Sequence, residues 1–526
     1  MRYVMAIDAG TGSGRAIVYG SDGSIAGLAQ EEWSHPAAPG VPNGLDFDTA
    51  ANGALIDRVI AGAIARAGIG AAEIKAVSTT SMREGVVLYD AEGRALWACP
   101  NVDARAQVEA EELVAAGIAD RVFAIAGDWV SITSPARLLW IRKHRPDVAA
   151  RARHLGLISD WLATRLTGAY FTEPSAGSST ALFDIASRRW SEELLGLLDI
   201  DAGIFPPVVE PGTAIGHVTP EAAERSGLAA GTPVVAGGGD TQLALVGLGR
   251  KAGDATLVGG SFWQMTMLAD GPLVDPARGP RTLCHATPRE WMVEGIGFLT
   301  GFSLRWLRDA FFEPLRHASD ESSFARIEAM AAAMPPGAGG VFATLANPMQ
   351  SDAWLHPSPG FVGFDFNRPE IGLGAMARSV MEAGAFAAHL HLTALEALSG
   401  LSFPRIQFTG GSSQGTLWPQ IVADVIGRPL DIPVVKETTA LGCAMLAAVG
   451  GGIFATLEEA VAAMASPIER TVEPDPAATE RYAGIEARWA RVNRAMTDLA
   501  LDGALEPLWR PAGALIDRRR HAIAVE

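Results

Sequence analysis

MAIDAGTGSGRAIVYG, residues 5–20, places one carboxylate, Asp8, at the end of an apolar run and follows it with a loop almost free of side chains. Apolar residues at 3–8 and 15–19 flank the glycines and predict a β-hairpin. Backbone N–H groups that converge in such a loop bind an anion, usually phosphate. A carboxylate would repel that anion unless a divalent cation lay between them, so the stretch indicates a nucleotide with Mg²⁺. The alternative is a tight β-turn with Asp8 as a turn residue.

A second stretch, TPVVAGGGDTQLALVGLG (232–249), repeats the plan of a strand, small residues and a carboxylate, Asp240. Two acidic loops facing one cleft would hold a metal and a phosphate from both sides. Phosphoryl transfer needs positioning, charge neutralisation and a base for the attacking hydroxyl. We predict that Asp240 is this base, and the alternatives are a metal ligand only or a turn residue.

Glycine turns follow predicted strands twice more, in DATLVGGSFWQMTML (254–268) and PRIQFTGGSSQGTLWPQIVADVIG (404–427). Two such turns fall in each half of the chain, which suggests a structural duplication. Amphipathic helical spacing over 50–68 and 135–146 alternates with these strands, so we expect a mixed α/β fold.

The chain has 526 residues, more than one hydrophobic core usually serves. We expect an N-terminal domain over 1–245, a C-terminal domain over 246–502 and a peripheral tail over 503–526.

A formal net charge of −17 disfavours nucleic acid and anionic membranes as partners. The three cysteines lie far apart, so neither a disulfide framework nor a zinc knuckle is indicated, which fits a reducing compartment. Asp8 interrupts the first apolar run too early for a signal peptide. The uncharged run 440–457 contains three consecutive glycines, which favours a buried helix over a membrane span. We therefore expect a soluble cytoplasmic protein.

Other phosphate motifs are absent from the sequence. It has no G-x-x-x-x-G-K-[ST], and GTGSGR fails G-x-G-x-x-G because Arg15 stands at the last glycine. One competing motif is present: GSSQG (411–415) matches G-x-S-x-G between a strand and a helix, which would make Ser413 a hydrolase nucleophile. Only one histidine, His521, follows it, so the hydrolase interpretation is disfavoured.

Arg83 and Glu84 follow a predicted strand over 74–82. Glu84 can accept hydrogen bonds from hydroxyl groups and Arg83 can donate to hydroxyl or carbonyl oxygens, which suits a polyhydroxy substrate. The alternative is a surface ion pair of little energetic value.

Several of these segments resemble those of a known family. Asp8–Arg15, Gly237–Asp240 and Gly410–Gly411 are similar to the three nucleotide-binding segments of the FGGY carbohydrate kinases, which belong to the actin/hexokinase/Hsp70 superfamily. SPARLLW (134–140), with Arg137 where lysine is usual, and MARSVMEAGAF (376–386) resemble two family signatures. The resemblance implies two ribonuclease H-like α/β domains with a cleft between them, the sugar on the N-terminal side and the nucleotide on the C-terminal side.

Within the family, the autoinducer-2 kinase branch is most similar. The resemblance rests on SMREG (81–85), WACPNVDARA (97–106), GGGDTQL (237–243) and VVKETTALGCA (434–444). As in that branch, Asn101 occupies a position where most family members have tryptophan. The resemblance implies ATP-dependent phosphorylation of the terminal hydroxyl of linear, hydrated 4,5-dihydroxy-2,3-pentanedione.

The resemblance also implies site residues. Asp240 would be the base, and Asp8 and Asp240 would hold Mg²⁺, partly through water. The nucleotide would contact Thr11, Gly12, Ser13, Arg15, Gly260, Ser261, Gly410 and Gly411. The substrate would contact Arg83, Glu84, Asp103, Asp240 and Gln242. Trp33, His35 and Trp263 are further candidates for substrate contacts, although such residues more often serve packing.

Two alternatives stay open. The acceptor of such a kinase could instead be xylulose, ribulose, erythritol or glycerol, since REG also resembles a pair in glycerol kinases. Their substrate tyrosine has no clear counterpart here, where 127–134 carries Trp129. A non-catalytic ATP-binding switch is the other class, but a switch has no use for Arg83–Glu84 or Asp103-x-Arg105. A homodimer is compatible with the sequence.

Overall fold

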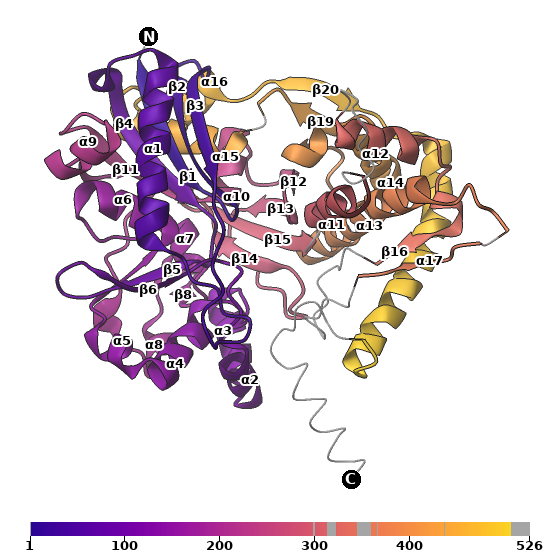
Figure 1. Ribbon diagram of the computed structural model, residues 1–526, viewed down its shortest axis with the longest axis horizontal. Helices are drawn as coiled ribbons and strands as arrows, with labels where there is room; N and C mark the ends of the chain where they lie inside the picture. Colours follow the sequence, from indigo (N-terminus) through magenta and orange to yellow (C-terminus); the bar gives the residue numbers. More distant parts are fainter. Residues whose placement is uncertain are drawn as a thin grey trace.

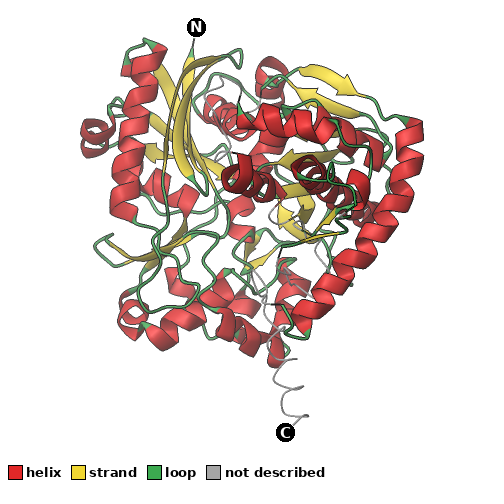
Figure 2. Ribbon diagram, turned by 45° about the vertical axis from the view of Figure 1, so that its right-hand side comes forward, coloured by secondary structure: helices red, strands yellow, loops and turns green. Residues whose placement is uncertain are grey.

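The computed structural model describes residues 2–297, 300–312, 322–344, 359–365, 367–435 and 437–505. Most of the predicted tail, including His521, lies outside the described residues. Two α/β domains lie side by side, the N-terminal one indigo to magenta and most of the C-terminal one pink to yellow (Figure 1). Sheets and covering helices alternate in both halves when the molecule is turned (Figure 2).

The N-terminal domain is built on a six-stranded sheet with the order β10-β11-β4-β1-β2-β3. Its strands are β1 (Tyr3–Ala9), β2 (Ser13–Gly20), β3 (Ile25–Glu32), β4 (Ile74–Ser81), β10 (Ala214–His217) and β11 (Pro233–Gly239). The predicted hairpin is confirmed as the antiparallel pair β1–β2. Strands β1, β4 and β11 run parallel, so their carboxyl ends meet at one edge of the sheet.

Side chains alternate along β1 between two buried faces. Met5 and Ile7 belong to a core with α1 (Thr49–Ala67) and α6 (Ile158–Thr167). Val4 and Ala6 belong to a separate core with α15 (Thr438–Gly450). Because side chains alternate, the carboxylate of Asp8 lies on the same face of β1 as Val4 and Ala6, toward α15.

Helix α15 contains the part of the uncharged run up to Gly450, and the prediction of a buried helix that ends at the glycines is confirmed. It packs on β1, β4 and β11, although it lies about 200 residues or more after them in the chain. The helix ends at Gly450, where the glycine run begins. In the part of the chain that the structure describes, none of the helices combines the length and the apolar character that a membrane crossing requires.

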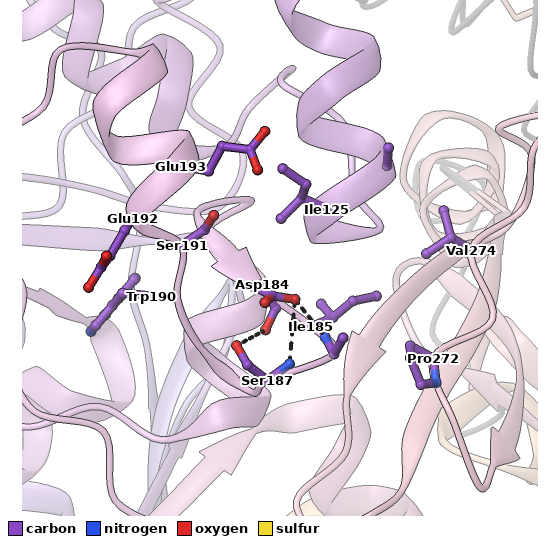
Figure 3. A pocket seen from close by; sticks show the side chains of 12 residues that line it. Ile125, Asp184, Ile185, Ser187, Trp190, Ser191, Glu192, Glu193, Pro272 and Val274 are labelled. Atoms are coloured by element: carbon purple, nitrogen blue, oxygen red, sulfur yellow. Dashed lines mark hydrogen bonds between the residues drawn. The ribbon is translucent and has the colours of Figure 1, made fainter.

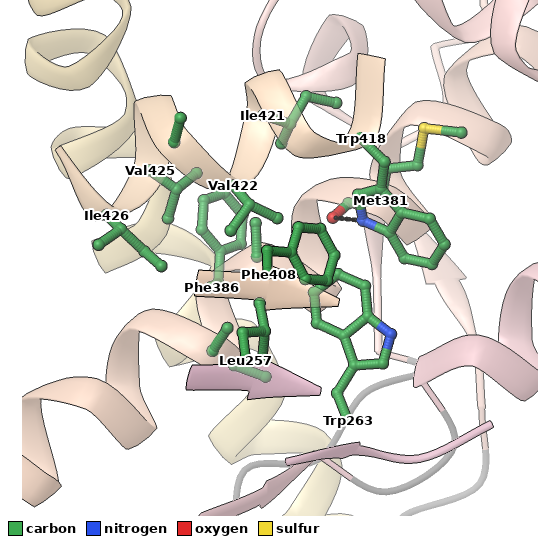
Figure 4. Packing of buried hydrophobic residues seen from close by; sticks show 14 of the residues in the cluster. Leu257, Trp263, Met381, Phe386, Phe408, Trp418, Ile421, Val422, Val425 and Ile426 are labelled. Carbon is green, nitrogen blue, oxygen red and sulfur yellow. Dashed lines mark hydrogen bonds between the residues drawn. The ribbon is translucent and has the colours of Figure 1, made fainter. Parts of the chain in front are cut away.

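The C-terminal domain is built on a seven-stranded sheet with the order β14-β15-β13-β12-β18-β19-β20. Its strands are β12 (Ala255–Gly259), β13 (Trp263–Ala269), β14 (Arg281–Cys284), β15 (Trp291–Gly297), β18 (Ile406–Thr409), β19 (Leu430–Pro433) and β20 (Ile468–Val472). Helices α13 (Leu373–Ser399) and α14 (Leu417–Ile426) cover one face. Trp263, Phe408 and Trp418 form the aromatic centre of this core (Figure 4).

Smaller elements complete the chain. A third sheet consists of β5 (Val86–Tyr89), β6 (Ala95–Cys99) and β7 (His154–Leu157). Two further sheets have two strands each: β8 (Phe183–Asp184) pairs with β9 (Arg189–Trp190), and β16 (Phe342–Ala343) pairs with β17 (Phe361–Val362). The remaining α-helices are α2 (Gln107–Ala115), α3 (Ile118–Ala126), α4 (Ser134–His144), α5 (Pro146–Arg151), α7 (Pro174–Ser178), α8 (Glu192–Leu197), α9 (Pro220–Ser226), α10 (Asp240–Gly247), α11 (Thr300–Leu307), α12 (Ser323–Ala332), α16 (Leu457–Met464) and α17 (Pro476–Leu501).

The glycine triplet 237–239 is not a turn, which corrects the sequence interpretation. All three glycines lie within β11, and α10 starts immediately afterwards at Asp240. A Cβ atom on Gly237 would lie 1.8 Å from the carbonyl oxygen of Thr79 in β4. The absence of a side chain therefore allows β11 to approach β4, and Asp240 projects directly from a strand–helix junction.

Candidate active site

Three predicted site segments meet at the carboxyl edge of the N-terminal sheet. In register, Ala9 of β1 lies opposite Ser81 of β4, which lies opposite Gly239 of β11. Each strand end is next to one candidate residue: Asp8, Arg83 and Asp240, respectively. In α/β proteins this edge of parallel strands is where ligands bind.

Asp240 is the first residue of α10, and its side chain is 38 % exposed. Its Oδ1 atom accepts a hydrogen bond of 2.7 Å from the backbone N–H of Thr241 and lies 3.6 Å from Nε of Arg83. Removal from bulk water raises the pKa of Asp240 to about 6. The carboxylates of Asp8 and Glu84 act in the same direction, and Arg83 opposes them.

Asp8 is buried, and its two oxygens differ. Oδ2 accepts from Nε of Arg15 at 2.7 Å and lies 2.6 Å from Nη2 of Arg15 in an ion pair, whereas Oδ1 is buried without a hydrogen-bond partner. Arg15 also forms an ion pair with Glu437, at the start of α15. The predicted nucleotide contact Arg15 therefore links β2 to α15 in this structure, and the free oxygen of Asp8 suits a cation.

Mg²⁺ prefers oxygen ligands and keeps several of its waters. The carboxylate of Asp8 lies close enough to Asp240 to raise the pKa of Asp240. In each of the two carboxylates, one oxygen already contacts a donor of the protein. Among the described residues, no group of three or more His, Cys, Asp or Glu side chains is arranged to bind a metal. A cation held by two carboxylates, water and phosphate oxygens fits this donor set.

The β1–β2 loop is held from outside by two aromatic residues. Trp33 donates its indole N–H to the carbonyl of Gly10 at 3.1 Å, and Nε2 of His35 lies 2.7 Å from the carbonyl oxygen of Thr11. The Thr11 hydroxyl also accepts a hydrogen bond from the Asn101 amide at 3.1 Å. Trp33 and His35 thus support the loop, in agreement with a packing role.

The glycine turns of the C-terminal sheet lie at one edge. Strands β12 and β18 are parallel, with Val258 opposite Thr409, so Gly260 and Gly410 follow adjacent strand ends. Gly410 has φ of +91°, and a Cβ atom there would lie 2.6 Å from the carbonyl oxygen of Gly259. Gly411 has open space around it. Ser261 accepts backbone hydrogen bonds from the start of α11.

Arg83 and Glu84 are buried in charged surroundings, not on the surface. Nη1 of Arg83 donates to Glu294 at 2.6 Å, and Glu84 lies 2.9 Å from Nη1 of Arg281. Glu84 has φ of +61°, in the left-handed region that glutamate seldom adopts. Arg281 and Glu294 belong to the C-terminal sheet.

Sequence reasoning missed Asp128, Arg281 and Glu294. Arg281 also donates to the buried carboxylate of Asp128 at 2.9 Å, and burial raises the pKa of Asp128 to about 6. Burial acts to raise the pKa of Glu294 as well, but Arg83 and Arg281 hold it below its usual value. No local sequence pattern marks Asp128, Arg281 or Glu294 as site residues. The one available signal is the position of Arg281 and Glu294 within apolar strands, because a charged residue there needs a buried partner.

Asp103 and Arg137 organise a neighbouring loop. Oδ1 of Asp103 accepts from the backbone N–H of Leu45 and from Nε of Arg105, both at 2.8 Å. Arg137 donates to the carbonyls of Glu84 and Asp103. The Asp103 carboxylate thus contacts this loop and Arg137, and Arg137 connects it to Glu84.

Gln242 lies in α10, close behind Asp240, and is fully buried. Its amide nitrogen donates to the carbonyls of Ser175 and Cys284, and its amide oxygen has no hydrogen-bond partner. The Ser175 hydroxyl accepts a hydrogen bond of 3.0 Å from the backbone N–H of Gly239. Gln242 and Ser175 therefore support the strand–helix junction that presents Asp240.

Ser413 is unsuited to the hydrolase interpretation. It is fully buried, and its hydroxyl donates to the carbonyl of Gly410 at 2.8 Å. Trp263 donates its indole N–H to the neighbouring Ser412 and packs on Phe408. Ser413 and Trp263 are thus both part of the support of the glycine turn.

A hollow of about 740 Å³ lies between the two domains. It is lined on one side by Asp184, Trp190 and Glu193 and on the other by Pro272 and Val274 (Figure 3). None of the predicted site residues lines this hollow, so it is separate from the Asp8–Asp240 region.

Family models describe most of the chain. The N-terminal domain of the FGGY family of carbohydrate kinases matches residues 3–247, and the C-terminal domain of that family matches residues 262–451. The chain belongs to the FGGY family of carbohydrate kinases. As an FGGY kinase it is a phosphotransferase with an alcohol group as acceptor, and kinases of this family use ATP.

Curated relatives of this FGGY kinase match over nearly their whole length. An autoinducer-2 kinase of Escherichia coli (strain K12) is 39 % identical over 519 residues, covering 97 % of this chain and 98 % of that protein. An autoinducer-2 kinase of Yersinia enterocolitica is 38 % identical over 518 residues with the same coverage.

Solved structures share the fold. Xylulose kinase from Rhodospirillum rubrum superposes with a TM-score of 0.80 at 25 % identity, covering 95 % of this chain and 99 % of that one. Plasmodium falciparum glycerol kinase with ADP has a TM-score of 0.78 at 19 % identity, covering 94 % and 98 %. The likeness supports the actin/hexokinase-like architecture of this FGGY kinase.

Proposed function

We propose that this FGGY kinase transfers the terminal phosphoryl group of ATP to the terminal hydroxyl of linear 4,5-dihydroxy-2,3-pentanedione, with Asp240 as general base. The observation that carries the chemistry is the position of Asp240 at the sheet edge, partly exposed and beside Arg83. With a pKa of about 6, its carboxylate is mostly ionised at neutral pH and able to accept a proton from a hydroxyl.

Arg83 and Glu84 are the proposed acceptor contacts nearest this base. Arg83 remains fully charged and donates to hydroxyl or carbonyl oxygens, while Glu84 accepts from hydroxyl groups. Asp103 and Gln242 complete the proposed set, since each is buried and keeps one side-chain oxygen without a hydrogen-bond partner. A compound with adjacent hydroxyl and carbonyl groups matches such mixed donors and acceptors.

The nucleotide is proposed to lie between the glycine edges of the two sheets. Thr11, Gly12 and Ser13 would present backbone N–H groups from one side, and Gly260, Ser261, Gly410 and Gly411 would line the other, where Gly411 has open space around it. Mg²⁺ bound by Asp8 and Asp240 would neutralise phosphate charge. Closure of the domains would exclude water from the transfer.

The choice of acceptor rests on the relatives named autoinducer-2 kinases and on the segments SMREG and NVDARA. The second candidate acceptor class is another small polyol or ketose, because the solved structures of similar fold include xylulose and glycerol kinases. A non-catalytic ATP-binding switch would have no acceptor for Arg83 and Glu84 to bind.

ADP release from the purified protein, ATP and Mg²⁺ tests the proposal. Dihydroxypentanedione, xylulose, ribulose, erythritol, glycerol and gluconate are supplied separately. We expect a kcat/KM at least about tenfold higher for dihydroxypentanedione than for any other acceptor. Preference for another acceptor would overturn the substrate assignment, and no turnover with any of them would favour a switch.

A further inference from the structure

Two charged residues of the C-terminal sheet meet the proposed acceptor contacts. Arg281 of β14 and Glu294 of β15 are direct partners across the antiparallel pair, and Nε of Arg281 donates to Oε1 of Glu294 at 2.6 Å. Both side chains are almost completely buried. Charged groups are buried at this depth only when partners compensate them, and the partners here come from the other domain.

Glu294 fixes Arg83. Its Oε1 atom accepts from Nη1 of Arg83 at 2.6 Å, which leaves Nε of Arg83 at 3.6 Å from Asp240. That separation favours the ionised carboxylate but is too long for a hydrogen bond. Without Glu294, the guanidinium would be left with the carboxylates of Glu84 and Asp240, and a turn toward Asp240 would occupy the carboxylate that must accept a proton.

Arg281 holds Glu84 through an ion pair. Its Nη1 atom lies 2.9 Å from Oε1 of Glu84 and 2.9 Å from Oδ2 of Asp128. The backbone of Glu84 is held in the left-handed region, with its carbonyl bound by Arg137. Such strain persists where the surroundings determine a conformation that function requires.

We propose that Arg281 and Glu294 are positioning residues for the phosphoryl acceptor, Glu294 by holding Arg83 away from Asp240 and Arg281 by aiming the carboxylate of Glu84. The acceptor site is then complete only where the two sheets meet. This inference rests on the proposed roles of Arg83, Glu84 and Asp240.

Steady-state kinetics of Glu294→Gln and Arg281→Gln test this role, using whichever acceptor the unmodified protein phosphorylates best. We expect kcat/KM for the acceptor to fall about tenfold or more in both variants, through kcat in Glu294→Gln, where Arg83 would block the base, and through KM in Arg281→Gln, where Glu84 would lose its partner, while the KM for ATP stays within about twofold. Arg281→Lys keeps the charge and should recover a large part of the acceptor affinity. Glu294→Asp provides the corresponding conservative variant if Glu294→Gln does not fold.

Arg378→Gln is the matched control, because Arg378 and Glu382 form a buried ion pair of 2.8 Å in the same domain, with Tyr482 as a further partner. It should lower the melting temperature and leave the KM for the acceptor unchanged. An unchanged kcat/KM for the acceptor in folded Arg281 and Glu294 variants would overturn the positioning role. Absence of turnover in the unmodified protein would instead overturn the proposed function.

Discussion

Nε of Arg83 lies 3.6 Å from Oδ1 of Asp240, which places a permanent positive charge beside the proposed base without a hydrogen bond. Arg83 comes from the end of β4 and Asp240 from the end of β11, so the parallel pairing of these strands creates the relationship. Arg83 opposes the effects of burial, Asp8 and Glu84 on the pKa of Asp240.

The first prediction concerns pH. If Asp240 must be ionised, kcat/KM should rise with pH through about 6, falling roughly tenfold per pH unit on the acid side. Arg83→Gln removes a charge that lowers this pKa, so the acid limb should move to higher pH, whereas Arg83→Lys should move it less. Asp240→Asn should reduce kcat by about 10²- to 10⁴-fold while ATP binding is retained. An acid limb that stays in place in Arg83→Gln would contradict this account.

The second prediction concerns the metal. Asp8→Asn removes the negative charge of the buried carboxylate whose Oδ1 has no partner, so we expect the Mg²⁺ concentration for half-maximal ADP release to rise about tenfold or more. Glu437→Gln is the control, since it removes the other partner of Arg15 and leaves Asp8 intact. Equal Mg²⁺ requirements in Asp8→Asn and the unmodified protein would remove Asp8 from the proposed metal site.

The third prediction separates two adjacent glycines. Gly410→Ala forces a side chain onto a positive φ and against the Gly259 carbonyl, so we expect a loss of about 1–3 kcal/mol in the free energy of unfolding and a higher KM for ATP. Gly411→Ala meets nothing within 4 Å and should keep its stability. A higher KM for ATP in Gly411→Ala would then indicate that the bound nucleotide lies close to the Gly411 backbone. An unchanged KM for ATP would argue against this position of the nucleotide.

The fourth prediction tests the helix contact behind Asp240. A Cβ atom on Gly442 of α15 would lie 1.9 Å from the carbonyl oxygen of Leu243 in α10. Gly442→Ala should therefore separate the two helices, lower the melting temperature by several degrees and reduce kcat by displacing Asp240. Gly484→Ala, in an exposed part of α17 with open space around it, should instead add about 0.5–1 kcal/mol to the free energy of unfolding. Equal melting temperatures for both variants would contradict the close packing of α10 and α15.

Much of the fold was predictable from local patterns. The β1–β2 hairpin, β4, α1 and the buried α15 lie where apolar runs, helical spacing and the glycine run predicted them. The glycine triplet 237–239 was misread as a turn, because local sequence cannot show that β4 passes within contact distance of its backbone. The candidate residues Asp8, Arg83 and Asp240 were predictable because each lies at or just after the end of a predicted strand.

Local sequence was enough to predict the glycine-rich strand ends in both halves of the chain, the two carboxylates Asp8 and Asp240 and the family likeness, because these depend on residues close together in the chain. Which charges meet depends on the tertiary structure. Arg83 pairs with Glu294 and Glu84 with Arg281 across about 200 positions, and Arg15 pairs with Glu437 across more than 400. Such partners are set by strand register and by the packing of one domain against the other, and no periodicity within either segment encodes them.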